Sequence, residues 1–182
     1  MTATTIPIAV AIALLLAASG YARAEDKPAA PASPPAPAGC VAPEHRQFDF
    51  WLGDWTVRNP QGDIVGENHL TSLHKGCALF ENWTGKGNFT GSSLNIYDAE
   101  RKRWHQTWVD VSGSLLELDG GFVDGKMVLA GNSPPDDKGV IVVQRITWTP
   151  LPDGRVRQLW ETSTDGRKTW TTAFDGYYSK AK

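Results

Sequence analysis

Short segments in which apolar and polar residues alternate follow one another from about residue 54 to the C-terminus. These segments are rich in Trp, Val, Ile, Thr and Tyr, which is typical of half-buried β-strands. Clusters of Gly, Asn, Asp and Pro separate them at short and roughly even intervals. The pattern predicts about ten strands, at or near residues 54–58, 64–74, 77–84, 91–98, 103–111, 114–121, 125–131, 140–149, 155–163 and 168–178. Only the segment from Pro43 to Leu52 has a helical spacing, which predicts one or two helical turns.

The connections between these strands are of hairpin length. Short sequential links favour pairing between neighbours in the chain, and therefore a closed barrel over a two-sheet sandwich. Closure also removes the exposed edges that a long open meander would present. No internal repeat is visible, which argues against a propeller. The predicted fold class is all-β, a closed antiparallel up-and-down barrel of about ten strands.

The N-terminal residues predict export. An apolar run from Ile6 to Ala18 is followed by Ala22, Arg23 and Ala24, the pattern of a signal peptide over residues 1–24. The run is shorter than the roughly 20 residues of a membrane-spanning helix, so no permanent membrane anchor is expected. Residues 25–39 are mostly Pro and Ala, which predicts an extended linker. The folded domain is therefore expected at 40–182, in a protein that is periplasmic or secreted from a bacterium.

The two cysteines, Cys40 and Cys77, are predicted to form a disulfide, because disulfides persist in exported proteins. Closing this loop of roughly 36 residues would stabilise the fold by about 3 to 4 kcal/mol in the chain-entropy model. Residues 38–40 also look like the end of a lipoprotein processing site, but Pro37 stands where Leu is expected. Lipidation of Cys40 and free thiols are the alternatives.

Composition narrows the function classes. Eight Trp and six Phe supply the large apolar side chains that a disordered chain lacks. The chain has 18 basic and 20 acidic residues and a net charge of −2, so it lacks the broad cationic surface of a nucleic-acid-binding protein. A small-molecule ligand is the expected partner, with no nucleic acid.

Alternation within the strands assigns their inner faces, because successive side chains of a strand point to opposite sides. In the strand at 155–163, Arg155, Arg157 and Glu161 share a face expected to be solvated. The opposite face, and the Trp-bearing face of the other strands, are assigned to the interior; these residues are Leu79, Glu81, Trp83, Trp104, Gln106, Trp108, Asp110, Val142, Gln144, Ile146, Trp148, Val156, Gln158, Trp160 and Thr162.

The strand at 91–98 stays ambiguous. Hydrophobicity alone would place Leu94 and Ile96 inside, whereas Ser93, Asn95 and Tyr97 form the opposite face. Asn95 and Tyr97 are kept as candidate pocket residues.

The predicted interior combines large aromatic side chains with Glu, Gln and Asp. Unpaired buried polar groups cost a few kcal/mol each. Either a ligand cavity relieves that cost, or the polar groups satisfy one another or bind water. The cavity interpretation gives ten candidate ligand-binding residues: Glu81, Trp83, Asn95, Tyr97, Gln106, Trp108, Asp110, Trp148, Gln158 and Trp160.

Two other functions stay open. A hydrolase or isomerase would use Glu81 and Asp110 as acid and base, since burial against aromatic rings raises a carboxyl pKa toward neutrality. No nucleophile, metal or phosphate-loop motif accompanies them. His69 and His74 fall on opposite faces of a strand, and no metal site is predicted. The other alternative is a structural or interaction module without a ligand.

The segment from Phe48 to Trp55 contains the Gly-x-Trp of lipocalin-like first strands. Together with residues 81–83, 93–97, 104–110 and 163–170, it makes the domain resemble an uncharacterised family of bacterial secreted proteins. The resemblance implies a lipocalin-like barrel of about ten strands, distantly similar to nitrobindin-type barrels, and implies no activity.

A nitrobindin-like protein would bind haem, and this sequence departs from that pattern. Thr56, Val57 and Arg58 follow Trp55 in place of further glycines, and the last strand has no His as a proximal ligand. His105 is predicted to point outward. No haem or other cofactor is therefore expected.

Overall fold

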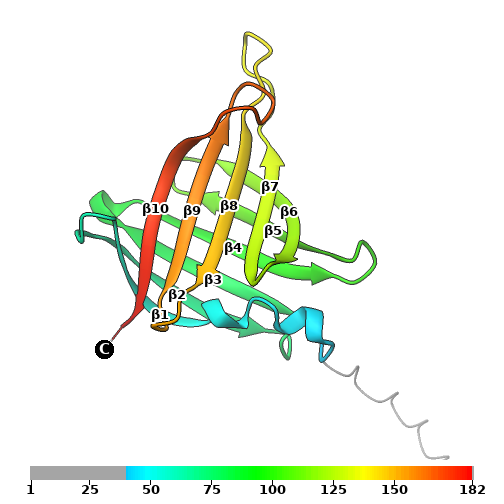
Figure 1. Cartoon of the computed structure of the whole chain (residues 1–182), viewed down its shortest axis with the longest axis vertical. Coiled ribbons are helices and arrows are strands. Elements are labelled where there is room, and N and C mark those ends of the chain that lie inside the picture. The colour runs from blue at the N-terminus through cyan, green and yellow to red at the C-terminus, as the bar shows by residue number, and fades with distance from the viewer. Residues whose placement is uncertain (1–39, 182) are drawn as a thin grey trace, which may run out of the picture. The chain divides into compact units, whose positions relative to one another are not determined.

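A computed structural model describes residues 40–181, which form a closed antiparallel barrel of ten strands (Figure 1). Each strand pairs with its neighbour in the chain, and the first closes on the last. The strands are β1 (Gly53–Arg58), β2 (Ile64–Leu73), β3 (Ala78–Gly85), β4 (Thr90–Asp98), β5 (Arg103–Asp110), β6 (Leu115–Val123), β7 (Lys126–Asn132), β8 (Val143–Pro150), β9 (Val156–Ser163) and β10 (Thr171–Lys180). The predicted all-β, up-and-down barrel is confirmed.

The structure does not test the predictions for the N-terminal region. The predicted signal peptide (1–24) and linker (25–39) lie outside the described residues. Among residues 40–181, no helix has the length and apolar character needed to cross a membrane.

Two strands begin later than predicted, because their first residues are used by turns. Asp136 accepts hydrogen bonds from the backbone N–H of Lys138 and Val140, so β8 begins at Val143. Asp165 likewise accepts the N–H groups of Lys168 and Thr169 before β10 begins. An Asp that binds nearby backbone N–H groups stabilises a turn and takes those donors from the strand ladder.

The segment before β1 closes one end of the barrel. It forms two short 3-10 helices, η1 (Pro43–Arg46) and η2 (Asp49–Trp51), near the bottom of Figure 1. This confirms the predicted helical turns, and residues 43–52 are called the plug. Phe48 and Trp51 of the plug are fully buried, and their rings stack with centroids 4.9 Å apart.

Aromatic side chains of the wall complete this core. The Phe48 ring packs edge-on against Trp104 and Trp148, at centroid distances of 5.6 and 5.2 Å. Trp55 of β1 donates its indole N–H to the carbonyl oxygen of Trp51 at 2.8 Å. Large aromatic rings bury much apolar area, so this end of the barrel is filled with side chains.

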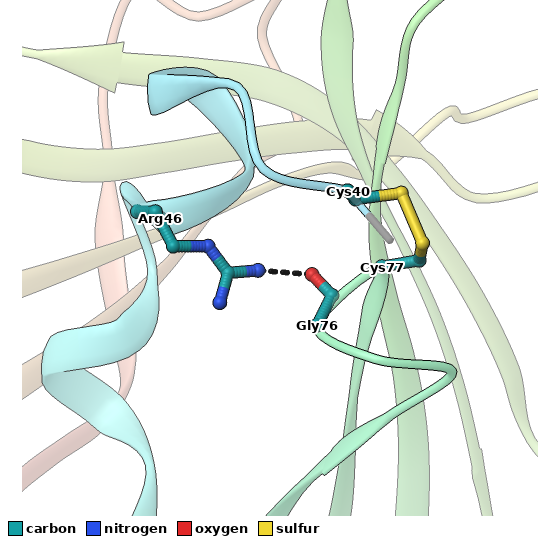
Figure 2. Close-up of a disulfide and its surroundings, with 4 residues drawn as sticks. All are labelled: Cys40, Arg46, Gly76 and Cys77. Carbon is teal, nitrogen blue, oxygen red and sulfur yellow. Dashed lines mark hydrogen bonds between the residues drawn. A yellow bond between two sulfur atoms is a disulfide. The ribbon is translucent and has the colours of Figure 1, made fainter. Parts of the chain in front are cut away.

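A disulfide between Cys40 and Cys77 ties the plug to the barrel wall (Figure 2). Cys40 precedes η1, and Cys77 lies in the turn between β2 and β3. Beside the disulfide, the Arg46 guanidinium donates to the carbonyl oxygen of Gly76 and pairs with Asp49 at 3.3 Å. The predicted disulfide is confirmed, and it suits an oxidising compartment.

The opposite end of the barrel is formed by the loops at 59–63, 86–89, 111–114, 133–142 and 164–170, and is called the open end. The two longest of these loops, β7–β8 and β9–β10, lie at the top of Figure 1. The loop from β3 to β4 carries a further 3-10 turn, η3 (Lys86–Asn88).

Candidate functional site

A cavity of ≈ 310 Å³ lies inside the barrel, toward the open end. Its lining reaches the β3–β4 loop through Lys86 and Phe89, whose side chains are exposed. The volume is at the small end of the roughly 300 to 1,000 Å³ of small-molecule sites. Fifteen residues line it: Val65, Glu81, Trp83, Gly85, Lys86, Phe89, Gln106, Trp108, Leu116, Ile146, Trp148, Gln158, Trp160, Phe174 and Tyr178.

Four indole rings dominate the wall of this cavity, and three of them have their N–H bound within the protein. Trp108 donates to Asp110 Oδ2 at 3.0 Å. Trp148 donates to Gln158 Oε1 at 3.2 Å, and Trp160 donates to Gln144 Oε1 at 2.7 Å. Because these donors are satisfied, the three rings offer mainly carbon surface to a molecule in the cavity.

Glycines in neighbouring strands make room for two of the indoles. A Cβ at Gly91 would lie 2.2 Å from Cζ2 of Trp108, and a Cβ at Gly66 would lie 2.6 Å from Cη2 of Trp83. Both rings therefore rest against backbone that carries no side chain. Isolated glycines within strands are a sequence signal of such close approach of a side chain to the backbone.

Gly91→Ala is expected to lower the free energy of unfolding by about 1 to 3 kcal/mol, because the new methyl group displaces the Trp108 indole from its place. The ring would shift within the cavity and change the near-ultraviolet circular dichroism. Urea unfolding measures the loss. The control is Gly121→Ala, where no atom lies within 4 Å of the added Cβ. Equal stability of the two variants would contradict the packing of Trp108 on Gly91.

A chain of hydrogen bonds between polar side chains crosses four strands at the inner wall of the barrel. The Glu81 carboxylate on β3 accepts from Asn68 Nδ2 at 2.7 Å and from Ser93 Oγ at 2.6 Å. Ser93 in turn accepts from Asn95 Nδ2 at 2.8 Å, and Asn95 Oδ1 accepts from Gln106 Nε2 at 2.7 Å. These five residues, here the Glu81 network, are all buried.

Burial also controls the ionisation of this wall. Desolvation raises the pKa of Glu81 from 4.5 to about 7, although the hydrogen bonds from Ser93 and Asn68 oppose the rise. Among residues 40–181, no Lys, Arg or His forms a salt bridge with Glu81. Burial and the nearby charge of Glu81 raise the pKa of Tyr178 well above 10. The cavity therefore contains one carboxyl group that is partly protonated at neutral pH, beside a neutral phenol.

The structure resolves the ambiguous strand in favour of its polar face. Ser93 and Asn95 are buried, whereas Leu94 and Ile96 are exposed on the outside of the barrel. Hydrophobicity alone gives the wrong face for β4, because the inner wall there belongs to the Glu81 network.

Seven of the ten candidate ligand-binding residues line the cavity: Glu81, Trp83, Gln106, Trp108, Trp148, Gln158 and Trp160. Asn95 is fully buried within the Glu81 network and does not line the cavity. Tyr97 packs near the plug, with its ring centroid 5.3 Å from that of His45 and 6.1 Å from that of Trp104. Alternation gives the face of a residue but not its depth along the barrel.

Asp110 is the third candidate outside the lining. It ends β5 at the open end, where its carboxylate accepts from the indole N–H of Trp108 and the backbone N–H of Ser112. Glu81 therefore lies in the cavity wall, whereas Asp110 does not line the cavity. Their use as an acid and base pair stays a prediction.

Sequence reasoning missed part of the site. It did not single out the open-end residues Lys86 and Phe89, or Phe174 and Tyr178 of β10, as lining residues. The alternation of Phe174, Gly176 and Tyr178 along the last strand is the signal that could have found two of them.

The described residues 40–181 contain no group of three or more His, Cys, Asp or Glu side chains placed to hold a metal ion. His105 lies on the outer face, as predicted, with Nδ1 2.9 Å from Asp119 and Nε2 2.9 Å from Thr107. Comparison of the sequence with models of known protein families, and with curated proteins, finds no match. The function is therefore inferred from the cavity itself.

Proposed function

We propose that this protein is an exported, lipocalin-like barrel that binds a small, ring-containing and partly polar ligand in its cavity. The observation that carries the proposal is the position of Glu81: a buried carboxyl group to which no described residue brings a positive charge, in the wall of a cavity of ≈ 310 Å³. Burying an ionisable group is unfavourable, and an apolar residue would serve a purely structural core better. A ligand that bonds to this wall explains why a polar group lies there.

The aromatic wall supports a ring-containing ligand. Aromatic pairs in stacked or edge-on arrangements gain about 0.5 to 1.5 kcal/mol beyond the burial of apolar area. Trp83, Trp108, Trp148 and Trp160 all line the same cavity. Gln106 and Gln158 supply polar groups that would orient the ligand.

Export is part of the proposal. The disulfide between Cys40 and Cys77 suits an oxidising compartment. A periplasmic or secreted location, after cleavage of the predicted signal peptide near Ala24, would place the barrel there.

Native mass spectrometry of the protein purified from its own host tests the proposal. The expected result is a mass excess that disappears on denaturation and gives a small ring-containing compound. A protein that carries no compound and binds none from a host metabolite extract would contradict ligand binding. It would favour a structural role instead.

Trp160→Leu is expected to weaken binding of the recovered compound by about tenfold, the equivalent of roughly 1.4 kcal/mol of lost ring contact. Isothermal titration calorimetry measures the change in Kd. Leu94→Ala is the control, because Leu94 is an exposed apolar residue on the outer face. Equal weakening by both variants would show that the effect does not arise in the cavity.

A further inference from the structure

We propose that the cavity selects a cationic amine, whose ammonium group binds at Glu81 while its ring lies among the indoles. This inference rests on the proposed function and adds the charge of the ligand.

The first support is the set of partners that Glu81 has and lacks. Its two hydrogen-bond donors, Asn68 and Ser93, are both neutral. Among the described residues 40–181, Lys86 is the only cationic residue that lines the cavity, and it follows the end of β3. Five residues along an extended chain span about 16 Å, and Lys86 is exposed at the open end. A cationic ligand would therefore supply the positive charge that none of the described residues provides at Glu81.

The second support is a hydrogen-bond acceptor without a donor, the side-chain oxygen of Gln106. Gln106 uses its amide N–H groups toward Asn95 and Ser93, and none of the described residues donates to its side-chain oxygen. Ser93 Oγ lies 2.6 Å from Glu81 and 3.4 Å from Gln106 Nε2, so the two side chains are close together. An ammonium group has three N–H donors and no acceptor, which matches a carboxylate beside an amide oxygen.

The third support comes from comparing three ligand charges. A carboxylate at this position would place two like charges in a poorly solvated site, which is strongly unfavourable. A hydroxyl group would donate one hydrogen bond to the carboxylate but would bring no positive charge to pair with it. An ammonium group would gain a charge pair, and also attraction to the indole faces, because aromatic rings attract cations. The expected order of affinity is amine, then alcohol, then acid.

Binding should release a proton. Tyr178 also lines the cavity, and burial and the charge of Glu81 raise its pKa, so the phenol stays neutral between pH 5.5 and pH 8. Because the pKa of Glu81 in the free protein is about 7, the carboxyl group is largely protonated at pH 5.5 and must lose that proton to pair with an ammonium. The affinity for an amine is therefore expected to fall more than tenfold between pH 8 and pH 5.5.

Calorimetry with three indole compounds tests the inference. Tryptamine, tryptophol and indole-3-propionate share a ring and a two-carbon chain, and end in an ammonium, a hydroxyl and a carboxylate. At pH 8, tryptamine should bind at least tenfold more tightly than either analogue. Glu81→Gln should abolish this preference and the pH dependence. Glu117→Gln, the same change at an exposed carboxylate of β6, should preserve both.

Several results would overturn the inference: equal or tighter binding of the alcohol or acid, a preference for tryptamine that survives Glu81→Gln, or no binding of any of the three. Recovery of a neutral or acidic compound by native mass spectrometry would also overturn it, while leaving ligand binding intact. A protein that carries and binds no compound would overturn the proposed function as well. The two failures are thereby distinguished.

Discussion

Glu81→Gln is expected to make the ligand-free protein more resistant to unfolding at pH 8.5, and to change its stability little at pH 5. The pKa of Glu81 is raised from 4.5 to about 7 by burial. Between pH 4.5 and pH 7, Glu81 is therefore mostly protonated in the folded protein but mostly ionised in the unfolded chain. The stability linked to this proton is fully present below pH 4.5 and is lost as pH rises through 7. Glutamine cannot ionise, so the variant escapes the loss.

The expected size follows from the shift in pKa. At 1.36 kcal/mol per unit, the difference between variant and wild type should grow by about 2.5 kcal/mol from pH 5 to pH 8.5, most of it between pH 5 and pH 7. Urea unfolding of both proteins at several pH values measures this difference in unfolding free energy. Titratable groups that the two proteins share contribute equally to both and cancel. Glu117→Gln should show no such trend. A constant difference between wild type and Glu81→Gln across this pH range would contradict a buried, ionisable Glu81.

Removing the disulfide is expected to have the other large effect. The variant Cys40→Ser with Cys77→Ser should lose about 4 kcal/mol of unfolding free energy. The two cysteines lie 37 residues apart. In the chain-entropy model, opening a loop of this length raises the conformational entropy of the unfolded chain by the equivalent of about 4 kcal/mol. Denaturant unfolding of the double variant and the oxidised wild type gives the difference.

The reduced wild type is the matched control, and it should unfold as the double variant does. Arg46→Met removes the polar contact with Gly76 but keeps the disulfide, and should cost much less. Hydrogen exchange should then show faster opening of the plug than of β8 and β9 in the double variant. A loss below 1 kcal/mol would contradict the role of the disulfide in stabilising the fold.

The sequence predicts the barrel well because, in most strands, inward-facing and outward-facing residues alternate. On β9, Arg157 and Glu161 lie on the outer side and form ion pairs there with Asp175 and Arg145. Their alternation with Gln158 and Trp160 therefore places the last two inside correctly. The number and order of the strands follow from the turns, which the sequence signals clearly.

The parts that could not be predicted depend on neighbours that are distant in the sequence. Ser93 and Asn95 are buried because Glu81 and Gln106 satisfy them, and the pattern of β4 alone contains no trace of this. Tyr97 faces inward but lies near the plug, since depth depends on where Phe48 and Trp51 fill the barrel. Local alternation describes one strand, whereas a cavity is what several strands leave unfilled.

The plug leaves the barrel closed at one end. Phe48 and Trp51 fill this end, and the disulfide joins the plug to the barrel wall. Under the proposed function, a ligand bound above them would enter and leave through the open end, so a second ligand could bind only after the first had left. Lys86 and Phe89 at the open end would then control the rate at which one ligand replaces another. A barrel that is closed at one end would, on this proposal, store or carry a compound rather than act as a channel.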